Sequence, residues 1–222
     1  MNAILLIAVV LATFISVYFL KPKDQSRVKL LLAFSGAFLL ALTFFELIPP
    51  VYTLGDRRTN TLFILLGILL QIFLEFFSKG AEHGHMHWEL SKNEFPVVLF
   101  ISLSLHALIE GMPIAEHGNL IYGILIHKIP VAFVLSFFLL NSRLSMFLSC
   151  LFIVLFSLMT PLGNYLVALE AFSAYKVQLT ALAVGVLLHI STIILFESAK
   201  GHSFDLKKLF VIILGFGIAY FI

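Results

Sequence analysis

Charged residues and cysteine are the scarce components of this sequence of 222 residues. Only 12% of the residues are charged and 61% are hydrophobic, whereas a soluble globular domain carries about 25% charged residues. Together with a mean hydropathy of +1.08, these values predict an integral membrane protein. The lone cysteine, Cys150, excludes an internal disulfide. The formal net charge of only +2 gives no indication of a nucleic-acid partner.

Several signatures of enzymes and of secreted proteins are also missing. The sequence has no CxxC or HExxH motif and no Gly-rich phosphate loop. The absence of thiolate pairs argues against a copper(I) site. Its first residues lack the charged n-region and the cleavage site of a signal peptide, so residues 2–20 are expected to form a membrane span.

Long apolar runs dominate the sequence instead. We mark eight of them, at residues 2–20, 28–48, 60–77, 95–116, 119–141, 144–168, 177–198 and 206–222. Each is expected to be helical, because lipid offers the backbone no hydrogen-bond partner, and about 20 helical residues cross the bilayer core. The sequence therefore predicts an all-α integral membrane protein, with eight transmembrane helices in a single domain over residues 1–222.

Basic residues are distributed unevenly among the connecting loops. Ten lie in the odd-numbered loops, whereas the even-numbered loops hold only Arg57, Arg58 and Lys176. The positive-inside rule then places the odd loops in the cytoplasm and both termini outside. The third loop, at about residues 78–94, is therefore expected to be cytoplasmic.

This third loop carries His83, His85 and His87 between acidic residues. Three histidines within five residues form a cluster of the kind that binds transition metals loosely. On the cytoplasmic side such a loop suits delivery or sensing of a metal. The alternative is a solvated polar loop in which histidine is enriched by chance.

Ionisable residues also stand near the middle of two neighbouring spans. His106 and Glu110 lie in one, and His127 lies in the next. A charge at mid-bilayer costs about 2.5–3.5 kcal/mol, so such residues normally face a bundle interior or water and mark a pathway. His106 and Glu110 lie about 40° apart on one helix face. The same face carries Ser102 and His117, which gives a polar stripe towards the outer surface.

Three histidines from separate spans are expected at a similar depth. With a rise of about 1.5 Å per residue, His106 lies about 16 Å from the inner edge, and His127 and His189 lie about 10 and 18 Å from the outer edge. Imidazoles with the Glu110 carboxylate suit zinc and its borderline neighbours. A hydrogen bond between helices is the alternative for a single histidine such as His189. Glu75 is expected at the inner interface, with release of ions to the cytoplasm as its alternative.

Lys128 follows His127 directly and is expected to pair with Glu110 or Glu46, or to snorkel poorly at this depth. A fixed cation there would repel a second metal, so one principal ion position is predicted; a purely structural ion pair is the alternative. At the outer ends of their spans, Glu46, Glu116 and His117 are expected to form a vestibule that attracts cations.

Two sequence motifs resemble those of the ZIP (ZRT/IRT-like) family of divalent-metal transporters. His106 to Gly111 resembles the family's helix-4 H-x-x-x-E-G, and His127 to Phe133 resembles its helix-5 segment in the form H-K-x-x-V-A-F. The tracts T-P-L-G at 160–163 and E-L-I-P at 46–49 add to the similarity, which covers nearly the whole chain.

The resemblance implies that helices 2, 4, 5 and 7 enclose a transport path and that His106, Glu110 and His127 coordinate the metal. His189 stands where the family often has an aromatic residue, and we expect it as a fourth ligand. Positions that hold further ligands in some members are occupied here by residues unsuited to that role, which implies a single ion: Ala107, Lys128, Val131 and Thr160.

We therefore predict a transporter in the plasma (inner) membrane, and not an enzyme, that moves Zn²⁺ or another first-row divalent cation towards the cytoplasm. The lipid bilayer and metal ions are its expected partners, and a homodimer is left open. The main alternative is an intramembrane zinc-dependent hydrolase with Glu110 as its acid–base group. A third interpretation is a membrane subunit whose polar residues only hold helices together.

Overall fold

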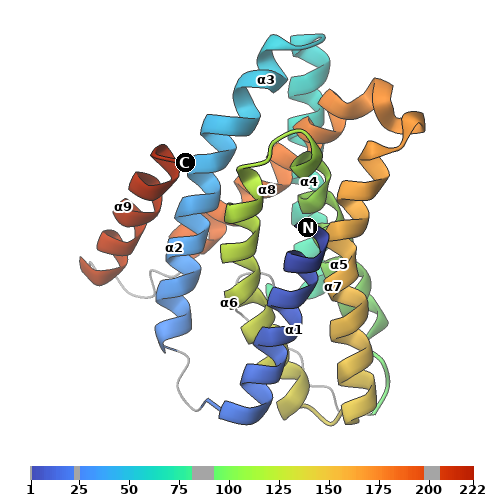
Figure 1. Ribbon diagram of the computed structural model, residues 1–222, viewed down its shortest axis with the longest axis vertical. Helices are drawn as coiled ribbons and strands as arrows, with labels where there is room; N and C mark the ends of the chain where they lie inside the picture. Colours follow the sequence, from blue (N-terminus) through green and yellow to red (C-terminus); the bar gives the residue numbers. More distant parts are fainter. Residues whose placement is uncertain (1, 23–25, 82–92, 198–205) are drawn as a thin grey trace.

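The computed structural model describes residues 2–22, 26–81, 93–197 and 206–222, and all secondary structure in these residues is helical (Figure 1). This confirms the all-α class. In chain order the elements are α1 (Asn2–Leu20), α2 (Ser26–Leu42), η1 (Thr43–Leu47), α3 (Ile48–Thr53), α4 (Arg57–Ser78), α5 (Val97–Gly111), η3 (Met112–Ala115), α6 (Leu120–Asn141), α7 (Met146–Ala168), η4 (Glu170–Tyr175), α8 (Lys176–Glu197) and α9 (Leu206–Tyr220).

Seven helical segments among the described residues are long and apolar enough to cross a membrane. They match the first seven predicted spans, with α2, η1 and α3 forming one segment, Val28–Thr53, and α5 and η3 forming another, Val97–Ala115. The eighth predicted span contains α9, which has only 15 residues and lies against α2 at one edge of the bundle (Figure 1). Large apolar side chains such as Phe19 and Phe76 point outward, as suits helices surrounded by lipid.

Two helix pairs pack at very short distance through glycine. In the α4–α8 pair, a Cβ on Gly67 would collide with the Leu182 carbonyl oxygen. In the α5–α7 pair, a Cβ on Gly163 would collide with the Leu108 carbonyl oxygen. Small residues permit this approach of backbones, which is a main source of helix association in lipid. Since α4 also packs against α5, the two pairs meet.

The second span is interrupted by a π-helical turn, η1. The Ile48 N–H donates to the Thr43 carbonyl five residues earlier, and the following Pro49 and Pro50 have no N–H to donate. Such turns in α-helices frequently occur at functional sites. This one contains Glu46, which is half-buried.

The apolar core explains where polar residues can be placed on α6. The first part of α6, through Ile124, packs in a cluster with side chains of α2 and α8. Its later part, from Val131 onward, packs in a second cluster with α1, α5 and α7. His127 and Lys128 lie between these two stretches. The polar residues therefore occupy the point where α6 passes from one apolar cluster to the other.

Candidate metal centre

Three potential metal ligands from two helices meet inside the bundle. His106 and Glu110, one turn apart on α5, converge with His127 on α6, and one ligand atom from each lies within 4.8 Å of the others. All three residues are at most 2% exposed. The imidazole centroids of His106 and His127 are 6.5 Å apart. They are the three residues for which the resemblance to the ZIP motifs implies metal binding.

The spacing of these three side chains is close to what a dication requires. Zn–N and Zn–O bonds of about 2.0–2.2 Å place the ligand atoms around a tetrahedral zinc roughly 3.5 Å apart. Moving from the present separations to that geometry needs side-chain adjustments of about 1 Å. A neutral imidazole pair with one carboxylate is the donor set of many zinc sites, so the residues fit this metal.

Lys128 neutralises the carboxylate of this group. Its Nζ donates to Glu110 Oε2 at 2.6 Å, and both side chains are buried. Lys128 Nζ also lies 5.1 Å from the centroid of the Phe156 ring, where the face of the ring favours a cation. Of the partners that the sequence allowed for Lys128, the structure therefore shows Glu110. The other carboxylate oxygen, Oε1, is buried and has no hydrogen-bond partner among the described residues.

Gln71 is a neighbour of the site that the sequence analysis missed. It lies on α4, is fully buried, and its Oε1 is 3.2 Å from His106 Nδ1. A signal was present in the sequence, because Gln71 stands in an apolar run four residues before Glu75. That spacing places both polar side chains on one face of the helix.

His189 contacts a different carboxylate. Its Nε2 lies 2.7 Å from Glu75 Oε2, and the two side chains are 14% and 26% exposed. His189 is not in the group of convergent ligands found among the described residues. The contact between α8 and α4 accords with the helix–helix hydrogen bond considered for a single histidine, and it gives Glu75 a partner within the bundle. Ligation by His189 stays a prediction.

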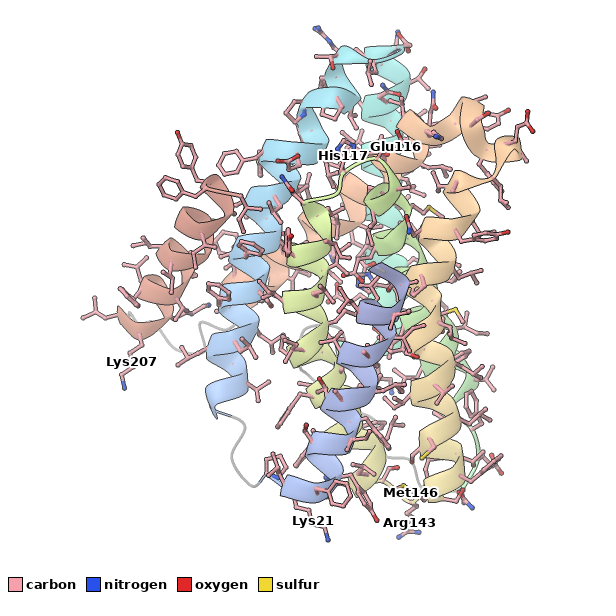
Figure 2. The ribbon with its side chains drawn as sticks, viewed as in Figure 1. Lys21, Glu116, His117, Arg143, Met146 and Lys207 are labelled. Carbon is pink, nitrogen blue, oxygen red and sulfur yellow. The ribbon has the colours of Figure 1, made fainter. Side chains whose placement is uncertain are left out.

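Two of the residues predicted for an outer vestibule, Glu116 and His117, lie towards one end of the bundle. Glu116 and His117 are near the upper end in Figure 2, whereas Lys21, Arg143 and Lys207 lie towards the opposite end.

Glu116 pairs with Lys176 at 2.7 Å, and both side chains remain more than a third exposed. With His117 they line a pocket of about 130 Å³ beside Pro50 and Val51.

His117, at this end of the bundle, has a perturbed pKa. Partial burial lowers the pKa of the imidazole, and the nearby carboxylates of Glu46 and Glu116 oppose this shift without cancelling it. His117 is therefore neutral, and able to accept a metal ion or a proton, over a wider pH range than a free histidine.

Two further parts of the prediction have different outcomes. Ser102 is buried on α5, and its hydroxyl donates to the Val98 carbonyl of its own helix at 3.0 Å, so its predicted place in the transport path stays a prediction. His83, His85 and His87 lie outside the described residues, and their predicted role in metal binding remains a prediction.

The chain is similar in sequence to a curated protein. It is 29% identical over 152 residues to zinc transporter ZIP1 of Danio rerio, in an alignment covering 63% of this chain. This similarity supports membership of the ZIP family. The chain spans about half the length of that ZIP relative. No family model matches the chain.

Proposed function

We propose that this chain is a ZIP-type transporter that carries a divalent cation, with zinc as the principal candidate, across the membrane towards the cytoplasm. The observation that carries the proposal is the convergence of His106, Glu110 and His127 within 4.8 Å in the interior of an apolar helical bundle. Lipid excludes a dication, and buried ligands of this kind replace its hydration shell.

The relative's name supports transport over the hydrolase alternative. That protein is called a zinc transporter, and an intramembrane hydrolase would also need a free acid–base group beside the metal. Glu110, the carboxylate considered for that role, has one oxygen bound by Lys128. We therefore assign Glu110 to ion binding.

The proposed direction rests on the distribution of charge. Three basic residues of the odd loops, Lys21, Arg143 and Lys207, lie towards one end of the bundle. Glu116 and His117 lie towards the other end (Figure 2). The positive-inside rule makes the basic end cytoplasmic. Cations would then enter beside Glu116, His117 and Glu46, reach the buried ligands, and leave at the basic end, with both termini outside.

Transport requires that the buried site open to each side in turn. We propose that the α4–α8 pair and the α5–α7 pair each move as a rigid unit, because the backbones of the two helices in each pair are in close contact at glycine. In a secondary transporter, such rocking of one helix group against another exposes a midplane site alternately.

The decisive experiment is uptake of radiolabelled zinc by the purified protein in proteoliposomes. We expect His127→Gln to reduce uptake at least tenfold. Changing a residue that only hydrogen-bonds to a metal ligand already costs about 10–100-fold in metal affinity, and this variant removes a proposed ligand itself. Ser104→Ala is the matched control, because Ser104 lies on α5, and its hydroxyl has no hydrogen-bond partner among the described residues. A Gly118→Cys variant, labelled with a membrane-impermeant thiol reagent, reports the orientation of the protein.

Three outcomes would contradict the proposal. Uptake equal in His127→Gln and in the wild type would remove the metal site from the path. Uptake only from the side opposite Gly118 would reverse the direction. Uptake that rises steadily from pH 7 to pH 5 would contradict the ligand set, because imidazole and carboxylate must be deprotonated to bind the ion.

A further inference from the structure

A buried amide contacts one of the metal ligands from the neighbouring helix pair. Gln71 on α4 has no exposed surface, and its Oε1 faces His106 Nδ1 on α5 at 3.2 Å. Its Nε2 is also buried and has no hydrogen-bond partner among the described residues. Burying an amide N–H without a partner costs about 1–3 kcal/mol, so packing alone does not explain a glutamine here.

The chemistry of the two groups determines which ring nitrogen carries the proton. A side-chain carbonyl oxygen only accepts hydrogen bonds, so this contact requires a proton on His106 Nδ1. In a neutral imidazole Nε2 then has the free lone pair. Histidines that bind metals usually donate their other N–H to a carbonyl or carboxylate, which fixes both tautomer and ring orientation.

We propose that Gln71 is a positioning residue for the metal site: its carbonyl holds His106 in the Nδ1–H tautomer, so that Nε2 is presented to the ion. This inference deepens the proposed function and rests on it for its consequence in metal binding. Gln71 itself is not assigned as a ligand.

The position of Gln71 also couples the site to helix movement. Gln71 belongs to the α4–α8 pair and His106 to the α5–α7 pair, and each pair is held together by a glycine contact. A displacement of one pair against the other lengthens the 3.2 Å contact before it disturbs either pair internally. The ligand geometry, and hence the affinity for the ion, then differs between the two orientations of the carrier.

The test measures the tautomer directly in the metal-free protein. Long-range ¹H–¹⁵N NMR spectra of ¹⁵N-histidine-labelled protein distinguish Nδ1–H from Nε2–H imidazole, and a His106→Asn variant assigns the signal. We expect His106 of the wild type to be the Nδ1–H form. In Gln71→Leu the population should move towards Nε2–H, and the zinc dissociation constant should rise about 10–100-fold.

Two further variants separate positioning from a general structural role. Gln71→Glu keeps an acceptor opposite Nδ1, so it should retain the Nδ1–H tautomer and bind zinc at least as well as the wild type. Gln178→Leu removes a second glutamine of the bundle, which lies on α8 and is only partly buried. It should change neither the tautomer of His106 nor the zinc dissociation constant.

The inference is overturned if wild-type His106 is the Nε2–H tautomer, or if Gln71→Leu leaves tautomer and zinc affinity unchanged. If Gln71→Leu does not fold, the wild-type spectrum and the Gln71→Glu variant decide between the same outcomes. If the wild type shows no zinc uptake, the proposed function is refuted but the role of Gln71 is not, because the tautomer is measured without metal and without transport.

Discussion

Two glutamate–lysine pairs in this protein have nearly the same length and very different surroundings. Glu110–Lys128 measures 2.6 Å and is buried in the bundle, with side-chain exposures of 0% and 4%. Glu116–Lys176 measures 2.7 Å and lies near the surface at the end of the bundle that carries His117, with exposures of 43% and 35%; we call it the outer pair and Glu110–Lys128 the inner pair. The comparison separates the effect of geometry from the effect of environment.

The difference in burial changes what each pair contributes. Around the outer pair, water screens both charges, and such exposed pairs contribute about 0–1 kcal/mol. In the interior, removing one partner leaves an uncompensated charge and costs about 3–5 kcal/mol, although the intact pair adds little net stability because both groups are desolvated. The inner pair is therefore sensitive to single substitutions and tolerant of paired ones.

The inner pair also has a consequence for ion binding. Lys128 balances the charge of Glu110, and an arriving dication would have to share this one carboxylate with Lys128. Glu110 Oε1 has no hydrogen-bond partner among the described residues and is the oxygen on which we expect the ion. Because Lys128 already binds this carboxylate, we expect a single ion here, and the number of ions stays a prediction.

The largest expected effect comes from breaking the inner pair. Glu110→Leu should lower the free energy of unfolding by about 3–5 kcal/mol, because Lys128 is left charged and buried. Lys128→Met should lower the free energy of unfolding by a similar amount, because the Glu110 carboxylate is then left charged and buried. The free energy of unfolding of the double variant should be close to that of the wild type, because both charges are removed together and apolar side chains fill similar volumes. The free energy of unfolding of the wild type, the two single variants and the double variant is measured in detergent micelles by circular dichroism.

Zinc binding provides the control for this cycle. The double variant should be stable and yet bind no zinc at concentrations that saturate the wild type, because it lacks the only carboxylate of the ligand group. Additive losses of stability in the double variant would show that the two side chains do not act as a pair.

The sequence was sufficient to predict the helices and the convergence of His106, Glu110 and His127, for physical reasons. The cost of bare backbone in lipid predicts helices wherever apolar runs are long, and the i, i+4 spacing placed His106 and Glu110 on one face. The contacts between helices were harder to predict from the sequence. The contacts of Gln71 with His106 and of Glu75 with His189 join α4 to α5 and to α8, and they depend on glycine-mediated packing that no single segment encodes.

The depth of a residue was also a weaker guide than its partners. Counting residues along the spans placed His189 in the same layer as His106 and His127, yet the His189 side chain turns to Glu75. Equal depth does not imply a common site, because each helix also has a rotation about its own axis that only packing fixes.

The outer pair should respond far less to the same kind of change. We expect Lys176→Gln to alter the free energy of unfolding by less than about 1 kcal/mol, with the difference disappearing at high salt because the charges are exposed to solvent. The same detergent unfolding measurement at low and high salt checks this. A loss comparable to that of Glu110→Leu would show that the outer pair is effectively buried, for example by a partner chain.

The smallest expected effect concerns His117, beside the outer pair. Because burial lowers its pKa in the folded protein, the unfolded chain binds the proton more readily between the ordinary histidine pKa of about 6.5 and the lower folded value. Stability therefore falls as the pH drops below about 6.5, and it recovers above it. His117→Gln does not titrate, so the melting temperature of the wild type relative to this variant should decrease between pH 7 and pH 5. Other groups contribute equally to both proteins and cancel in this difference. A relative melting temperature that increases on acidification would mean that the carboxylates of Glu46 and Glu116, rather than burial, determine the pKa of His117.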